Sequence, residues 1–352
     1  MLLVTNTHMG KMGKKRIIWI DWAKSLCMFL VVLGHCHIQP SMHLLTQIIY
    51  SFHIPLFFFI SGLLSPKSSS KSSVLKDIRY IIIPYFIFGI LQIVFHSLLS
   101  RDFSFYFYLI NIRSLCIGTD ANIGAIWFLP ALFICKQLYF LLLWIKKKSF
   151  YAYIIILVLS LLPTYFISLY DINLMLFADS ALFGLPFFLI GNNSSFLYNG
   201  NWHKNTFIIV ILSIILLAST IILSKFNGFV SIAICDYGNN LFLYYINAIT
   251  GIAASIGICL LLRNHCIDFI YITSYGTIVT LGFHGSILLV LQYYIPMYLG
   301  FYTPSINLPI AFLYSSIAYI ICYIIILLGD YHCPQLIGLK GRLQTNKQLK
   351  TE

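Results

Sequence analysis

The sequence predicts an all-α, polytopic integral membrane protein with about ten transmembrane helices and both termini in the cytoplasm. Of its 352 residues, 60% are hydrophobic and only 9% are charged. In a soluble globular protein about 25% of the residues are charged. The mean hydropathy is +0.89. Long apolar runs recur along the chain at the length that one helix needs to cross the hydrocarbon core, about 20 residues.

The predicted spans are 17–37, 44–64, 78–99, 124–145, 150–169, 173–191, 206–224, 241–262, 276–296 and 308–328. Segment 103–118 contains Asn111 and Arg113 and is too polar to span. We therefore expect it to lie at a membrane interface or to cover a cavity. Residues 17–329 then form the membrane domain, between a basic N-terminus (1–16) and a polar tail (330–352) that both lie in the cytoplasm.

The distribution of Lys and Arg sets the orientation, because cytoplasmic loops carry an excess of both. With the N-terminus inside, seventeen of these residues fall on the cytoplasmic side, and three, Arg101, Arg113 and Lys225, fall outside. The other two, Lys24 and Lys136, lie within predicted spans. The net charge of +12 is thus explained by membrane topology, and we expect no nucleic acid partner.

The first two spans carry polar groups that are costly in a bilayer and so mark function by default. They are Asp21, Lys24 and His35 in the first span and His53 in the second. Lys24 and His35 are separated by about three helical turns, so they share one face about 16 Å apart along the axis. Asp21 lies on the same stripe, within pairing reach of Lys24. Alternatively, Asp21 and Lys24 only extend to the inner interface, and His35 only caps the outer end.

The residues around these groups form motifs. The run Asp21-Trp-Ala-Lys24 leads to Val31-Val-Leu-Gly-His35, and a second block reads Phe52-His-Ile-Pro-Leu-Phe-Phe-Phe-Ile-Ser-Gly62. Two further blocks are Arg79–Tyr85 and Ile126–Leu132. With these motifs the chain resembles the acyltransferase 3 family of integral membrane acyltransferases, and within it the fucose 4-O-acetylase-like sugar acetylases. The likeness covers about residues 17 to 328.

The resemblance implies transfer of an acetyl group from cytoplasmic acetyl-CoA to a hydroxyl of a cell-surface or lipid-linked sugar, at the inner (cytoplasmic) membrane. An alcohol that attacks a thioester needs a base, and an imidazole, with an unperturbed pKa of about 6.5, is the usual choice. We interpret His35 as this general base and His53 as a second catalytic or acceptor-binding group. The residues expected at the donor site are Asp21, Lys24, Arg79 and Trp127.

The chain departs from the family's pattern in two places. Lys136-Gln137 replaces the more usual continuation of the block around Trp127. The ninth span, whose stretch up to Phe283-His284 only faintly resembles the family, lacks a clean Gly-Lys-Asn-Ser start, and this leaves the role of His284 open.

A second hypothesis comes from another functional class. A transporter or flippase for a lipid-linked saccharide or a small anion would also suit many spans with polar groups near the midplane. Such a protein would move its substrate without acetyl-CoA, whereas an acyltransferase releases free CoA. The sequence contains no HExxH, CxxC or Asp-rich cluster, so we expect no metal.

Overall fold

The computed structural model describes residues 16–36, 38, 43–67, 71–118, 121–152, 162–170, 172–199, 205–301 and 303–339. Within these ranges the regular elements are all helices, and β-structure is limited to the isolated bridges Ile38–Ile306 and Ser231–Asp236. The predicted all-α class is therefore confirmed. The helices are α1 (Ile18–Gly34), α2 (His43–Leu64), α3 (Lys71–Asp77), η2 (Ile78–Ile82), α4 (Ile83–Ser100), α5 (Phe105–Ile117), η3 (Ala121–Trp127), α6 (Phe128–Lys148), α8 (Leu162–Leu169), η4 (Met175–Phe177), α9 (Ala178–Asn193), α10 (Phe196–Asn199), α11 (Thr206–Asn227), η6 (Ile232–Ile234), α12 (Leu241–Leu261), α13 (Asp268–Tyr275), α14 (Thr277–Leu289), η7 (Val290–Tyr294), α15 (Ile295–Tyr298) and α16 (Leu308–His332).

Eight helical stretches in the described chain are long and apolar enough to cross a membrane. They correspond to every predicted span except the first and the fifth. The first coincides with α1, which has 17 residues and carries Asp21 and Lys24. The fifth, 150–169, falls largely outside the described residues. The protein is thus a multi-pass membrane protein, and "inner" and "outer" below refer to the orientation predicted from Lys and Arg.

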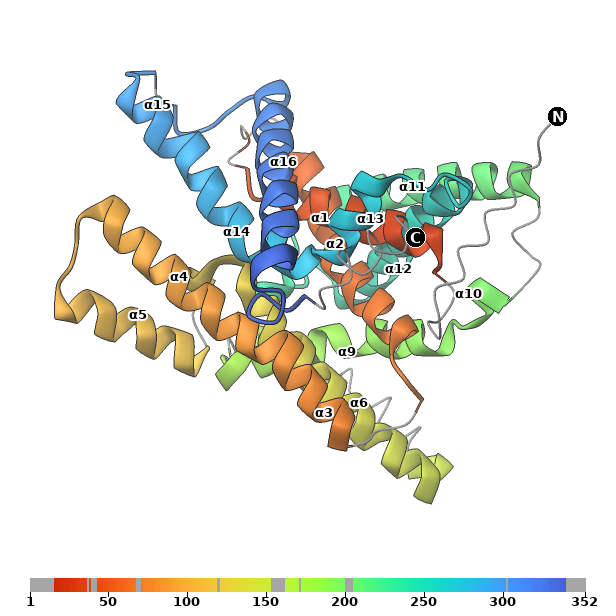
Figure 1. Cartoon of the computed structure of the whole chain (residues 1–352). Coiled ribbons are helices and arrows are strands. Elements are labelled where there is room, and N and C mark those ends of the chain that lie inside the picture. The colour runs from red at the N-terminus through yellow and green to blue at the C-terminus, as the bar shows by residue number, and fades with distance from the viewer. Residues whose placement is uncertain are drawn as a thin grey trace, which may run out of the picture.

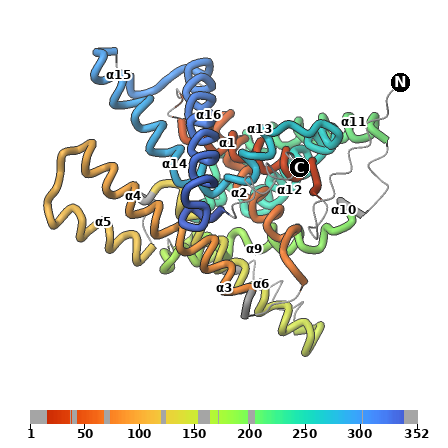
Figure 2. The backbone as a smooth tube through the Cα atoms, in the orientation of Figure 1, coloured from red at the N-terminus to blue at the C-terminus, as the bar shows by residue number. Residues whose placement is uncertain are grey.

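Helix α1 lies at the centre of the bundle, where it packs against α2, α12, α13, α14 and α16. Figure 1 shows it near the middle of the molecule, with α4 and α5 on one flank and α11 on the other, and Figure 2 traces the same path of the backbone. Its residues Ala23, Cys27 and Val32 are completely buried. Because the neighbours change along its length, the two ends of α1 face different surroundings.

Helices α2 and α9 cross at a pair of glycines. A Cβ atom on Gly62 would lie 1.9 Å from the carbonyl oxygen of Phe188, and one on Gly191 would lie 2.0 Å from that of Phe59. Both distances are far below van der Waals contact, so only glycine permits this approach. Small residues let helix backbones approach closely in membranes, where dispersion contacts replace the hydrophobic effect as the driving force. The crossing holds α2, and with it His53, against the bundle.

Segment 103–118 forms α5, which turns back antiparallel along α4 (Figure 1). The hydroxyls of Tyr108 and Ser97 are 2.8 Å apart near the turn, and Tyr85 Oη donates to the Leu115 carbonyl at 2.6 Å near the other end. The side chain of Leu115 fills the space beside Gly89. The segment therefore covers α4, and it contributes no residue to the cavity described below.

The described part of the predicted polar tail packs against the bundle. Helix α16 continues to His332, and the completely buried Asp330 accepts a 2.6 Å hydrogen bond from Tyr275 Oη. Beyond it, Ile337 and Leu339 are also buried. Residues 340–352 lie outside the described part of the chain.

Candidate active site

Three histidines from three helices meet at the outer half of α1. His35 follows the last residue of α1 and is exposed, whereas His53 of α2 and His284 of α14 are buried. The ring centroids of His35 and His284 are 5.1 Å apart. His35 also lies within electrostatic range of His53. The structure thus brings together both predicted catalytic residues, His35 and His53, and adds His284.

The two buried histidines are held in the same way. His53 Nδ1 lies 2.7 Å from the carbonyl oxygen of Ile49, and His284 Nδ1 lies 2.7 Å from that of Thr280. A carbonyl oxygen only accepts hydrogen bonds, so each Nδ1 must carry the proton. In a neutral ring the lone pair then resides on Nε2, which points away from the residue's own helix. Two imidazoles are therefore fixed in the tautomer that can accept a proton or a hydrogen bond on Nε2.

His284 is the residue whose role the sequence resemblance left in doubt. It lies in an apolar span, which is the signal that also singled out His35 and His53. The sequence could not show that His284 lies near His35, because 249 residues separate the two. The packing of α14 against α1 brings the two histidines together.

An outer cavity of about 290 Å³ opens beside His35. One wall comes from the outer half of α14 and from η7, and the other comes from the segment that leads into α16. The bridge between Ile38 and Ile306 holds this segment beside the end of α1. The lining residues other than His35 are Gly285, Leu288, Leu289, Gln292, Tyr293, Thr303, Pro304 and Ile306. The cavity is thus mostly apolar, with a few polar groups near the imidazole.

A second and much smaller space lies on the inner side of the histidines. This apolar slot of about 30 Å³ is lined by Met28, Ile54, Phe57, Phe128, Thr277, Ile278 and Leu281. Met28 precedes His35 on α1, Leu281 precedes His284 on α14, and Ile54 follows His53 on the antiparallel α2. The histidines therefore stand between the outer cavity and the slot.

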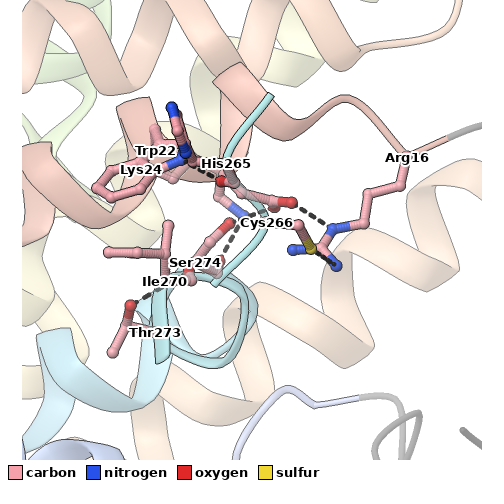
Figure 3. Close-up of polar contacts among 9 residues, drawn as sticks. Arg16, Trp22, Lys24, His265, Cys266, Ile270, Thr273 and Ser274 are labelled. Atoms are coloured by element: carbon pink, nitrogen blue, oxygen red, sulfur yellow. Dashed lines mark hydrogen bonds and ion pairs between the residues drawn. The ribbon is translucent and has the colours of Figure 1, made fainter. Parts of the chain in front are cut away.

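Polar side chains join the inner end of α1 to α13 (Figure 3). Asp21 accepts hydrogen bonds through both carboxylate oxygens, from Arg16 Nε at 2.6 Å and from Ser274 Oγ at 2.8 Å. Lys24 Nζ donates to the Ser274 carbonyl at 2.6 Å. Asp21 and Lys24 thus share one partner residue on α13, as their common helix face predicts. They lie at the end of α1 opposite to His35.

Further contacts hold the same end of α1. Trp22 Nε1 donates to the His265 carbonyl at 2.8 Å, and the Arg16 guanidinium lies 4.0 Å from the centre of the Tyr271 ring. Partial burial is the largest single influence and lowers the pKa of Arg16, but the hydrogen bond and charge of Asp21, together with Cys266 and Tyr271, raise it by more in sum, so the pKa of Arg16 is raised. Arg16 therefore stays cationic, and the inner end of α1 is anchored by matched charges and hydrogen bonds.

The other two predicted donor-site residues occupy separate surroundings. Arg79 in η2 is exposed and donates to Gln335 Oε1 in the C-terminal segment. Trp127, at the end of η3, is buried, with the rings of Phe128 and Phe177 at 6.1 and 6.2 Å. Neither residue lines the outer cavity. Within the described residues, no group of three or more His, Cys, Asp or Glu side chains has a geometry that could hold a metal ion.

Comparison with known proteins agrees with this architecture. A family model described as an acyltransferase domain, that of the acyltransferase 3 family, matches residues 17–327. Comparisons with curated proteins and with solved structures give no match. The matched range contains the three histidines, the outer cavity, the slot and the Asp21–Lys24 contacts. The chain therefore belongs to the acyltransferase 3 family and is a multi-pass membrane acyltransferase.

Proposed function

We propose that this acyltransferase moves an acetyl group from cytoplasmic acetyl-CoA to a hydroxyl of a cell-surface or lipid-linked sugar, with His35 as general base. The inner (cytoplasmic) membrane is then its location. The observation that carries the proposal is the position of His35, which is exposed in an outer cavity beside a buried imidazole. An imidazole that lines such a cavity is placed to take a proton from a bound alcohol.

The proposed step balances with the groups at hand. His35 takes the proton of the sugar hydroxyl as its oxygen attacks the thioester carbonyl, and the carbon–sulfur bond breaks to release the CoA thiolate. The imidazolium of His35 then returns the proton to that thiolate. The products are an O-acetyl ester and free CoA, and no oxidant or reductant is consumed. His53, whose Nε2 lone pair also faces away from its helix, stands as the second imidazole near this reaction.

The order of features along α1 supports a donor that enters from the inner side. The polar contacts of Asp21 and Lys24 come first, the apolar slot at Met28 follows, and His35 ends the helix. A slot of about 30 Å³ suits a small acyl group such as acetyl. We assign Asp21 and Lys24 to shaping the donor entrance. Among the cytoplasmic cations, exposed Arg79 and the triple lysine at 146–148 would attract the CoA phosphates.

The acceptor is proposed to enter the outer cavity. Its volume of about 290 Å³ lies just below the range for small-molecule sites, roughly 300–1,000 Å³, so it suits a sugar unit rather than a length of polymer. Gln292 and Thr303 offer polar groups among apolar walls, which is the usual composition of a site that orients a hydroxylated ligand. Trp127 lies outside this cavity, so we place it on the donor side.

The test is a reconstituted transfer assay. The full chain in lipid vesicles is supplied with acetyl-CoA on its cytoplasmic face and with a lipid-linked sugar as acceptor, and both free CoA and acetylated sugar are measured. We expect equal amounts of the two products, and CoA release only when the acceptor is present. Movement of the sugar across the bilayer without any release of CoA would contradict the proposal and favour a flippase.

A further inference from the structure

We propose that His284 is a positioning residue that acts through His35. In this inference the Nε2 lone pair of His284 accepts a hydrogen bond from a ring N–H of His35. That bond turns the other ring nitrogen of His35, with its lone pair, toward the outer cavity. The inference rests on the proposed function of His35 as general base, and it gives a role to a side chain whose role the sequence resemblance left open.

The first observation is an unusual buried atom. His284 is completely buried, its Nδ1 proton is committed to the Thr280 carbonyl, and its Nε2 has no hydrogen-bond partner among the described residues. Buried polar atoms nearly always have partners in native proteins, so an exception needs an explanation. The His35 imidazole beside it, which could donate a ring N–H to this lone pair, supplies one.

The second observation is the geometry of the two rings. Their centroids are 5.1 Å apart and their planes meet at 56°, which places the two imidazoles in direct contact. His35 lines the outer cavity, whereas His284 does not. His284 therefore has no surface on which to meet the acceptor sugar and can influence it only through His35. Its neighbour Gly285 has open space beside it and forms part of the cavity wall, so the cavity extends past His284.

The chemistry follows from the tautomer rule for histidine. Which nitrogen of an imidazole is protonated depends on the hydrogen bond that the other nitrogen makes. A fixed acceptor behind His35 keeps one N–H in place before and after proton transfer. The other nitrogen then always presents its lone pair to the sugar hydroxyl, and the N–H held by His284 stabilises the imidazolium that forms.

The experiment compares two replacements of His284 in the reconstituted full chain. His284→Phe keeps a ring of similar size but removes the acceptor, and His284→Gln restores an acceptor oxygen. His96→Phe, on the exposed face of α4, is the matched control. We expect His284→Phe to lower kcat about 10- to 100-fold, by analogy with the loss seen when the outer-shell partner of a metal-ligating histidine is removed, with KM for acetyl-CoA little changed. His284→Gln should recover part of the loss, and the control should match the wild type.

A double variant separates positioning from structure. If His284 acts through His35, then the pair His35→Ala and His284→Phe should be no slower than His35→Ala alone. Multiplied losses, equal losses in the Gln and Phe variants, or full activity of His284→Phe would overturn the inference while leaving the proposed function intact. Full activity of His35→Ala would instead overturn the function of His35. Should His284→Phe fail to fold, His284→Met removes the acceptor with a more adaptable side chain.

Discussion

The two ends of α1 carry polar groups of opposite character. At the inner end, both carboxylate oxygens of Asp21 are bonded, to Arg16 and Ser274, and Lys24 is bonded to the Ser274 carbonyl. At the outer end, His35 stands in a cavity and faces His284, whose Nε2 has no hydrogen-bond partner in the described chain. A satisfied set of charges holds helices together, whereas a lone pair without a partner is available to accept a hydrogen bond from a neighbouring group. The same helix thus combines an anchor and a reactive end.

The difference shows that a polar residue in a membrane span has two physical explanations. Such a group is costly in hydrocarbon, so it must be compensated by partners or must have water or substrate beside it. Asp21 and Lys24 are compensated by hydrogen-bond partners on α13. His35 instead has the outer cavity beside it, which can hold water or substrate. Substitutions at the two ends should therefore alter different measured quantities.

The largest effect is expected at the outer end. Replacing His35 by Ala removes the proposed base, and the rate of acetyl transfer should fall about 10²- to 10⁴-fold. The protein should still insert, because His35 is exposed and lies beyond the last turn of α1. The rate is measured as acetylated sugar formed in vesicles, with His96→Ala as a control of the same residue type. Acetylated sugar at the wild-type rate would end the assignment of His35.

A smaller and different effect is expected at the inner end. Asp21→Asn weakens the bonds to Arg16 and Ser274 and should lower stability by about 1 kcal/mol, within the range for loss of a partner to a partly buried polar group. The lower part of that range applies because the Arg16 side chain is 37% exposed. The thermal midpoint of the detergent-solubilised protein should fall, with kcat nearly unchanged. Exposed Asp268→Asn is the control. A large loss of kcat at full stability would show that Asp21 takes part in the reaction, and the inner end of α1 would then not be only an anchor.

The smallest effect concerns the donor. Arg79→Gln removes an exposed cation and should raise KM for acetyl-CoA about 1.4- to fivefold, the scale of an exposed charge contact of roughly 0.2–1 kcal/mol. The increase should shrink at high salt, because exposed charges are screened. KM is measured at two ionic strengths, with Arg113→Gln on α5 as the matched control. An unchanged KM at low salt would show that Arg79 serves only its contact with Gln335.

Several features of the site could be predicted from the sequence because they depend on local pattern. The apolar runs predicted the helices, and the cost of polar groups in lipid singled out His35, His53, Asp21 and Lys24. The placement of Asp21 and Lys24 on one face followed from helical periodicity alone, and both do contact Ser274. The bonding of Asp21 to Arg16 and Ser274 was not predicted, since Ser274 lies 253 residues away along the chain.

What the sequence by itself determined is the class of the protein, because hydropathy and the distribution of Lys and Arg act on each segment separately. The tertiary structure alone decided that His284 faces His35, that Asp21 is shared between Arg16 and α13, and that α5 folds back on α4. Those arrangements depend on which helices become neighbours. Neighbours are selected by close packing, as at Gly62 and Gly191, and such packing depends on shapes that only meet once the chain has folded.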